Sequence, residues 1–441
     1  MPAAVDWRRV QLYAPIYFAI AYLVPAFING FPLVYWDTGG YLIAGVDDDY
    51  VPNRSSFYAW FLEYAGDQSV WLIILIQSAI VAFLLAATVR TLAPEERWAP
   101  LTALLLACFT SLPWYASWLM PDLFSGIAVL ATVMLGFGAI SGGTATMLVL
   151  LLIYSMVVHT SHFPLVVATL AGAGLSAVAF RCRLSWKLPL ACIAVAVALT
   201  VLVNDALTGK PFFNRTGWVL LFARMAEGGF VQRVLDERCS AEWESQWSKL
   251  CPYRAEIPEN AEQWLWKKGT PFWRIGDWEG TRYSSRRIVL IAIAEYPLET
   301  AEFALRGFAE QLVKVELGEG TESQEWFLRW TVRAAFPEEL QPWRQALQQQ
   351  GKLLPIARTV NYAHLPIVVV AIALTLFGIF SSRLPRSLRA ACLTMTIAFV
   401  ANAFVCGALS GPHDRYAVRL VWAMLGTGVP VAFFLIRPRR T

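Results

Sequence analysis

Apolar runs of membrane-spanning length dominate the pattern of hydrophobic and polar positions. Stretches of about 16 to 20 mostly apolar residues recur, each close to the length that crosses the roughly 30 Å hydrocarbon core of a bilayer. They lie near 11–30, 69–89, 99–117, 123–139, 146–160, 164–180, 188–203, 365–381, 388–408 and 418–436. The pattern predicts an all-α polytopic membrane protein with about ten transmembrane helices.

The one long hydrophilic segment interrupts these runs between the seventh and the eighth helix. It divides the chain into an N-terminal membrane domain of about seven helices (1–203), an inserted domain of mixed structure (204–363) and a C-terminal membrane domain of about three helices (364–441). Within the insert, 218–239 and 288–312 have helical apolar spacing interrupted by charge. Both are too charged to span a bilayer, so we expect amphipathic helices that lie on the membrane surface or pack as soluble helices.

Lysine and arginine are biased toward one side of the predicted membrane. With the N-terminus in the cytoplasm, the short outer loops (31–68, 113–122, 159–163 and 411–416) hold only Arg54 and Arg415. The cytoplasmic segments hold thirteen basic residues: Arg8, Arg9, Arg90, Arg97, Arg181, Arg183, Lys187, Arg383, Arg386, Arg389, Arg437, Arg439 and Arg440. This bias predicts that both termini are cytoplasmic and that the inserted domain is extracytoplasmic. The short loops and compact length favour a bacterial inner membrane.

Composition agrees with this class and narrows the partners. The chain is 57% hydrophobic and only 15% charged, which excludes a soluble globular protein of this length. Its net charge of +4 is explained by the basic residues beside the membrane, so we expect a lipid bilayer and no nucleic acid as a partner.

Cys239 and Cys251 lie in the predicted outer domain, where an oxidising environment favours a disulfide over a zinc site.

The polar residues near helix ends gather on the predicted outer face. Asp37 lies in the first outer loop, Asp122 ends the second, His159 and His162 form "HTSH" in the third, and His413, Asp414 and Arg415 form "GPHDRY" in the last. Each has a structural alternative. Asp122 is equally well explained as a helix N-cap. Arg415 could equally form an ion pair with Asp414 or extend to lipid headgroups. The two histidines are more simply explained as interfacial side chains than as metal ligands.

Asp37 is harder to explain as a cap, because its surroundings are unusual. The stretch "YWDTGGYLIAG" (35–45) places an acid between aromatic residues and a double glycine. Glycine permits close approach of a ligand or another helix, and aromatic faces suit sugars and lipid headgroups. The local sequence therefore favours a functional role for Asp37.

These features resemble the GT-C superfamily of membrane glycosyltransferases, which includes protein mannosyltransferases and the aminoarabinose transferases of lipid A. "WDTGGYLIAG" is similar to the acidic first outer loop of that superfamily, with Asp37 as the acid and Tyr41 as the aromatic residue. "NRSSFYAWFL" (53–62), "MPD" (120–122) and "HDRY" (413–416) resemble its later outer-face segments. The chain departs from the family in having a single acid in that loop and a soluble part between helices seven and eight.

The resemblance implies an enzyme that takes a sugar from a polyprenyl-phosphate carrier on the extracytoplasmic face and moves it to an acceptor, which the sequence does not identify. Asp37 is then the general base and His413 an assisting acid or base. Substrate would be bound by Tyr41, Arg54, Asp122, His159, His162, Asp414 and Arg415. No cofactor is required by this reading, although a divalent metal remains open. Arg215 and Arg224 of the outer domain are better explained as structural.

Three other classes stay open. A transporter or flippase would also keep polar residues near helix ends, but it usually carries ionisable groups within its spans. A non-catalytic assembly component of an envelope polysaccharide system would explain the folded outer domain. A hydrolase or acyltransferase would fit His413 and Asp414, but the chain has no nucleophile elbow and no HExxH motif.

Overall fold

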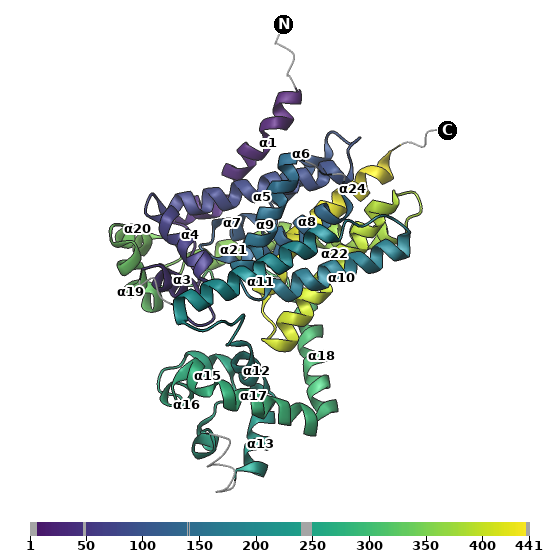
Figure 1. Ribbon diagram of the computed structural model, residues 1–441. Helices are drawn as coiled ribbons and strands as arrows, with labels where there is room; N and C mark the ends of the chain where they lie inside the picture. The colour runs from purple at the N-terminus through teal and green to yellow at the C-terminus, as the bar shows by residue number, and fades with distance from the viewer. Residues whose placement is uncertain (1–6, 47–49, 139, 141, 240–248, 438–441) are drawn as a thin grey trace. The chain divides into compact units, whose positions relative to one another are not determined.

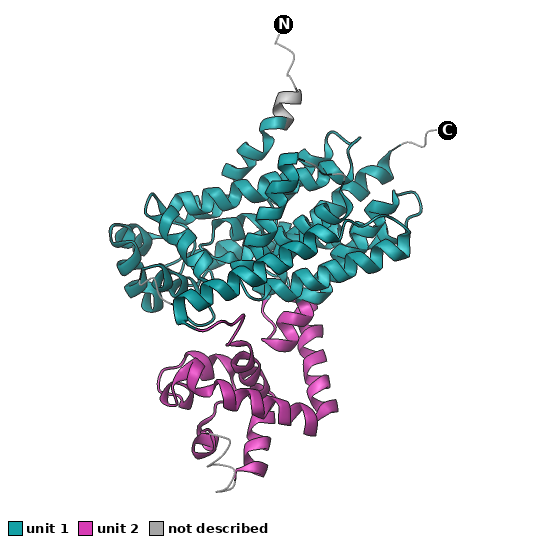
Figure 2. Cartoon of the chain, in the orientation of Figure 1, with its two compact units in different colours: residues 1–209, 315–402, 414–441 teal, residues 210–314, 403–413 magenta. Residues whose placement is uncertain are grey.

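The computed structural model describes residues 7–46, 50–138, 140, 142–239 and 249–437, and it divides into two compact units (Figure 2). The first unit contains residues 1–209, 315–402 and 414–441, and the second contains residues 210–314 and 403–413. The second unit therefore covers less of the chain than the insert expected over 204–363, since residues 315–363 belong to the first unit.

Helices make up the first unit (Figure 1). Its α-helices are α1 (Trp7–Ala21), α2 (Val24–Asn29), α3 (Thr38–Val46), α4 (Ser56–Gly66), α5 (Val70–Leu92), α6 (Ala99–Ala107), α7 (Leu112–Ser117), α8 (Phe124–Phe137), α9 (Gly142–Val157), α10 (His162–Phe180), α11 (Lys187–Thr208), α19 (Glu325–Ala335), α20 (Leu340–Gln345), α21 (Leu353–Phe380), α22 (Arg386–Leu409, which ends in the second unit), α23 (Asp414–Val421) and α24 (Leu425–Ile436). Three short 3₁₀ helices accompany them: η1 (Pro121–Leu123), η3 (Pro337–Glu339) and η4 (Trp422–Met424).

The second unit is also helical. It contains α12 (Gly217–Glu227), α13 (Phe230–Arg238), η2 (Cys251–Glu256), α15 (Ala261–Trp266), α16 (Pro271–Arg274), α17 (Asp277–Glu295) and α18 (Pro297–Val313). The described residues include no β-strand, and a single isolated bridge pairs Leu33 with Trp118. In place of the mixed structure expected for the insert, the regular elements that the structure describes there are all helices.

Seven helices within the described residues are long and apolar enough to cross a membrane, fewer than the ten expected. They cover Leu12–Asn29, Val70–Leu92, His162–Phe180, Lys187–Thr208, Leu353–Phe380, Arg386–Leu409 and Asp414–Ile436. Two more of the expected runs form shorter apolar helices, Pro121–Phe137 and Gly142–Val157. These lengths establish a membrane protein but leave the sidedness expected from the basic residues as a prediction.

The expected span at 99–117 is broken into α6 and α7. The break falls at residues 108–111, directly before Pro113 in the first turn of α7. Proline has no N–H to donate to the carbonyl of Phe109, four residues earlier, and its ring crowds that carbonyl, so a continuous helix through this point would lose a hydrogen bond. Apolar composition alone could not predict this interruption.

Helix α8 is short because it lies inside the unit. Every residue from Phe124 to Gly136 is buried. The helix packs against α5, α9, α10, α11 and α23. An all-round apolar helix enclosed by others needs no particular length to match a bilayer.

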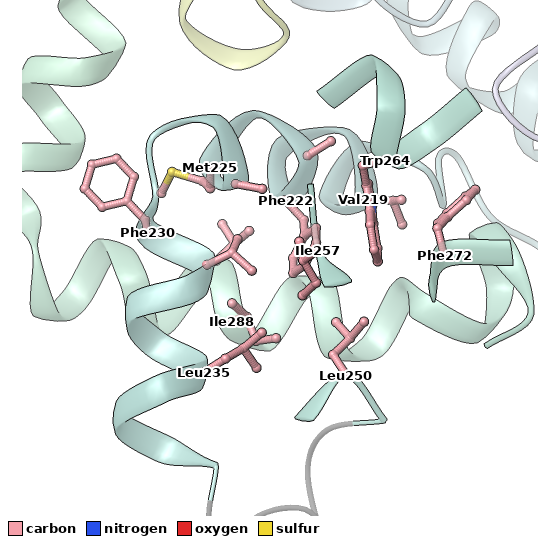
Figure 3. Packing of buried hydrophobic residues seen from close by; sticks show 14 of the residues in the cluster. Val219, Phe222, Met225, Phe230, Leu235, Leu250, Ile257, Trp264, Phe272 and Ile288 are labelled. Atoms are coloured by element: carbon pink, nitrogen blue, oxygen red, sulfur yellow. The ribbon is translucent and has the colours of Figure 1, made fainter. Parts of the chain in front are cut away.

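The second unit has its own core. On α12, Val219, Phe222, Ala223 and Ala226 follow the i, i+3, i+4, i+7 pattern, and all four are buried. They pack with Trp264 and other residues of the cluster in Figure 3. The expected helix at 218–239 ends early because Gly229 adopts a positive φ of 73°, a conformation that glycine reaches without strain.

A disulfide joins Cys239 and Cys251 across the edge of this core, as expected from the sequence. Cys251 is itself a core residue. The bond closes a short loop between α13 and η2, which restricts the unfolded chain more than the folded one.

We predict that replacing both cysteines (Cys239→Ser with Cys251→Ser) lowers the free energy of unfolding of the second unit by about 3 kcal/mol. Hydrogen exchange of amides in α12 and α17 of the detergent-solubilised protein measures the change. Cys108→Ser, which removes a free cysteine of the first unit, is the matched control and leaves this exchange unchanged. Rapid maleimide labelling of Cys239 in the unreduced native protein would contradict the bond.

Candidate active site

The turn before α3 does not use Asp37 as its cap. Thr38 makes the local bonds: its hydroxyl accepts from the backbone N–H of Tyr35 at 2.9 Å and donates to the carbonyl of Leu119 at 3.1 Å. These two bonds fix the start of the helix next to the chain that leads into η1. The Asp37 carboxylate is therefore left to make longer-range contacts.

The double glycine after Asp37 serves close packing within the protein. A Cβ on Gly39 would lie 2.6 Å from the Cδ2 atom of Leu328 in α19, and a Cβ on Gly40 would lie 2.9 Å from the Cγ atom of Arg54. Real Cβ atoms do not approach other atoms so closely. The glycines thus let α19 and the Arg54 side chain reach α3.

Two guanidinium groups hold the Asp37 carboxylate. Oδ1 accepts from Nη2 of Arg54 at 2.5 Å, and Oδ2 accepts from Nη1 of Arg415 at 3.2 Å. The three side chains are mostly buried, with exposed fractions of 20% for Asp37, 8% for Arg54 and 13% for Arg415. Burial by itself raises the pKa of the Asp37 carboxyl, but the charges of Arg54 and Arg415 outweigh it and hold the pKa below the usual value.

Arg415 also contacts a second acid, Glu319, which sequence reasoning missed. The backbone N–H of Arg415 donates to Oε2 of Glu319 at 3.0 Å, and its Nε lies 4.0 Å from Oε1. The Tyr35 hydroxyl donates to the same Oε1 at 3.3 Å. Arg415 therefore lies between two carboxylates, and the four charged side chains Asp37, Glu319, Arg54 and Arg415 balance.

Aromatic rings cover the two arginines. The Arg415 guanidinium lies 4.3 Å from the centre of the Tyr35 ring and 4.7 Å from that of Tyr416, and the Arg54 guanidinium lies 5.6 Å from that of Tyr41. Cations are attracted to the faces of such rings. Burial raises the pKa of Tyr35, so its hydroxyl stays protonated and remains a donor to Glu319.

A second buried ion pair lies one helical turn along α23. Arg419 donates through Nη1 to Oδ1 of Asp122 at 3.3 Å and through Nη2 to Oδ1 of Asn402 at 3.1 Å. The Asp122 and Arg419 side chains are only 4% and 1% exposed. Asp122 is thus engaged in an ion pair and is not the N-cap of α8, where Leu123 takes that position.

The "HTSH" histidines have defined internal partners. Nδ1 of His159 accepts from the backbone N–H of Ser161 at 3.2 Å and contacts its hydroxyl at 2.7 Å. Nδ1 of His162 lies 2.6 Å from the carbonyl of Ser155, to which it donates, so Nε2 accepts from the hydroxyl of Ser125 at 2.9 Å. Burial, together with the charges of the nearby arginines, Arg419 first, lowers the pKa of His159 to about 3. Both rings are therefore neutral hydrogen-bonding groups.

The last loop divides between the two units. Asp414 belongs to the first unit and accepts from the backbone N–H of Glu316 at 3.0 Å. Arg415 does not rely on Asp414 as its ion-pair partner, because it has Asp37. His413 belongs to the second unit, where its backbone N–H and carbonyl are bonded to the side chain of Gln311.

The two arginines set aside as structural have acidic partners in the second unit. Arg224 donates to Glu227 at 2.5 Å and is buried, and Arg215 lies 3.4 Å from Glu279. Both pairs join residues of that unit, which accounts for the two charges without a substrate.

No group of three or more His, Cys, Asp or Glu within the described residues is arranged to hold a metal ion. Asp47, Asp48 and Asp49, which the sequence suggests as a solvated loop tip or a metal ligand set, lie outside those residues.

Comparison with known proteins adds no family assignment. No family model matches the chain, and neither a curated protein nor a solved structure is significantly similar to it. The site must be interpreted from its own chemistry.

We predict that Arg419→Met destabilises the protein by about 3–5 kcal/mol, because it leaves the buried Asp122 carboxylate without its cation. The double variant Asp122→Leu with Arg419→Met recovers most of this loss, since both charges are gone. Chemical unfolding in detergent measures both. Arg306→Met, which breaks an exposed pair with Glu302, is the control and has little effect. Equal losses in the single and double variants would contradict the pairing.

We predict that stability falls as the pH drops below about 6.5, the ordinary value for histidine. The unfolded chain takes up a proton on His159 there, whereas the folded chain does not do so until about pH 3. Folding therefore becomes less favourable by at most about 1.4 kcal/mol per pH unit from this one group.

Thermal unfolding midpoints of the native protein and of His159→Gln, measured from pH 7.5 to pH 4.5, isolate the contribution of that ring. The midpoint of the variant depends less steeply on pH, since glutamine can still accept from Ser161 but does not titrate. Identical slopes would mean that His159 is protonated in the fold.

Proposed function

We propose that this protein is a membrane glycosyltransferase that takes a sugar from a polyprenyl-phosphate carrier and transfers it to an acceptor on the extracytoplasmic face. One observation carries the proposal: the buried carboxylate of Asp37 is held by two arginines from distant parts of the chain. Paired guanidinium groups bind phosphate oxygens in two places and stay charged. A candidate general base, Asp37, therefore lies in direct contact with a candidate phosphate site, formed by Arg54 and Arg415.

The reaction uses these groups in complementary roles. An acceptor hydroxyl attacks the anomeric carbon, a new C–O bond forms, and the bond between that carbon and the carrier phosphate breaks. Asp37 takes the hydroxyl proton. Arg54 and Arg415 stabilise the negative charge of the leaving phosphate, which lets the carrier depart as an anion.

The resting geometry supplies a reason for ordered binding. A carboxylate paired with two cations is a weak base, and the pKa of Asp37 is held low accordingly. A phosphate bound to Arg415 competes with Asp37 for that guanidinium. Asp37 would then regain basicity only when the donor is present, which limits deprotonation of water in its absence.

A transporter or flippase is the alternative with a specific observation in its favour. Arg419 lies inside the candidate span Asp414–Ile436 and pairs with the buried Asp122. The spans are therefore less free of ionisable groups than the sequence suggests, and such groups often mark transport pathways. This pair is satisfied by Asp122 and Asn402, which favours a structural role.

We predict that Asp37→Asn reduces transfer of labelled sugar from a polyprenyl-phosphate donor pool to acceptors by about 100-fold or more, the usual contribution of a general base. Arg415→Ala weakens donor binding and raises the donor KM. Membranes with matched amounts of each variant provide the assay, and thermal unfolding verifies that the variants fold. Arg306→Ala, a change at an exposed pair, is the activity control.

Full transfer by a folded Asp37→Asn protein would return Asp37 to a structural role. Movement of the labelled carrier across vesicle membranes without formation of a glycosylated product would favour the transporter.

A further inference from the structure

Helix α19 directs two tryptophans away from the first unit. Leu328, Thr331 and Val332 are buried and face the protein. The side chains of Trp326 and Trp330, in contrast, are 97% and 66% exposed. These two positions are four residues apart, so they lie on the same side of the helix. Apolar rings of this size are costly to leave in water, and a cluster of them marks a surface that meets a partner.

Neighbouring aromatic rings widen this surface. Phe327 is 48% exposed, and its ring lies 5.9 Å from that of Trp36, which is 44% exposed. We call Trp36, Trp326, Phe327 and Trp330 the exposed aromatic face. Because Trp36 directly precedes Asp37, this face continues to the turn that carries the candidate site.

The segment after α19 is fastened to the ends of three candidate spans. The first residue after the helix, Phe336, packs closely on Gly66, where a Cβ would lie 2.6 Å from its ring, just before α5 begins. The backbone N–H of Leu347 donates to the carbonyl of Asn29, the last residue of the first candidate span, at 2.9 Å. The span Leu353–Phe380 begins shortly afterwards. Helix α19, which packs on α3, therefore lies at the boundary where these spans enter the bilayer (Figure 1).

Two arginines flank the exposed aromatic face. The helical repeat places Arg329 and Arg333 beside Trp326, on the flank opposite Phe327, and both are exposed. Neither forms an ion pair with any residue that the structure describes. Glu325, the acid of this helix, pairs instead with Arg344 at 2.6 Å. The flank therefore offers two guanidinium groups, which suit the phosphate oxygens of lipid headgroups.

We infer that the exposed aromatic face of α19 inserts into the headgroup region of the bilayer, with Arg329 and Arg333 bound to the phosphates of anionic lipids. Helices that lie in this region carry Trp and Phe on one face and basic residues beside it. The fastening to three span ends favours the bilayer over a protein as the partner. The inference does not depend on the proposed function. It places Trp36, and with it the turn of Asp37, at the depth of the headgroups.

The insertion is tested with the full-length protein in nanodiscs of phosphatidylcholine and phosphatidylglycerol. Two labels are mapped by mass spectrometry: hydroxyl radicals generated in the water, and a phospholipid with a photoreactive diazirine in its upper acyl chain. Trp326 and Trp330 should react with the lipid and should lose most of the oxidation that they show after unfolding in urea. Trp343, which is fully buried in α20, is the matched control and should react with neither label in the folded protein.

Two results would contradict the insertion. Oxidation of Trp326 and Trp330 without labelling by the lipid would mean that the exposed aromatic face lies in water. Protection from oxidation without labelling by the lipid would mean that a second copy or another protein covers it. Either result overturns the inference.

The double variant Arg329→Gln with Arg333→Gln tests the charge. In the native protein, a phosphatidylglycerol form of the photoreactive lipid should label α19 more than a phosphatidylcholine form at the same mole fraction. The double variant should lower this preference by up to about 5-fold per arginine at low salt, which is the usual effect of one basic residue at an anionic surface. Arg329→Lys with Arg333→Lys keeps the charge and should retain the preference, and thermal unfolding verifies that both variants fold. Equal labelling by the two lipids in the native protein would overturn the binding of anionic lipid by these arginines.

Discussion

The contact between Asp37 and Arg415 is the constraint on which the rest of the first unit depends. It joins residues 378 positions apart in the chain, and both side chains are mostly buried. A buried charge without a partner destabilises a fold strongly, so the loop before α3 and the start of α23 must be held together. Arg54 completes the neutralisation of Asp37, and Glu319 does the same for Arg415. Several connections between helices are thereby fixed by one charge-balanced group.

Helix α23 extends this arrangement along its length. Arg415 and Arg419 are four residues apart, so they lie on one face of the helix. The first arginine pairs with Asp37, and the second pairs with Asp122 in η1. Asp37 and Asp122 both flank the bridge between Leu33 and Trp118, which ties their two segments together. One face of α23 therefore carries two arginines, and each neutralises one of the two aspartates that this face contacts.

Local sequence predicts which segments matter better than it predicts their partners. The aromatic and glycine frame singled out Asp37, and "HDRY" singled out Arg415, which the structure brings into contact. Glu319 and Arg419 were missed, although "GEG" and the i, i+4 spacing in "DRYAVR" were visible signals. Which charged residues pair across hundreds of positions in the sequence depends on how the helices pack, and a local sequence pattern does not contain that information. The same holds for helix limits: α8 and a true span are equally apolar, and only burial on all sides distinguishes them.

The low basicity of Asp37 in the resting state fits a transferase better than a hydrolase. A free carboxylate beside an activated sugar would deprotonate water as readily as an acceptor, and the donor would be wasted. In the proposed reaction, a carboxylate held by two guanidiniums would become active only after an anion has drawn one of them away, and the carrier phosphate would be that anion. The proposed chemistry would then be linked to donor binding through Arg415, which pairs with the acid in the resting protein. The mutual attraction of the buried charges offsets the cost of removing them from water, and in the proposed reaction the same pairing would control when the base acts.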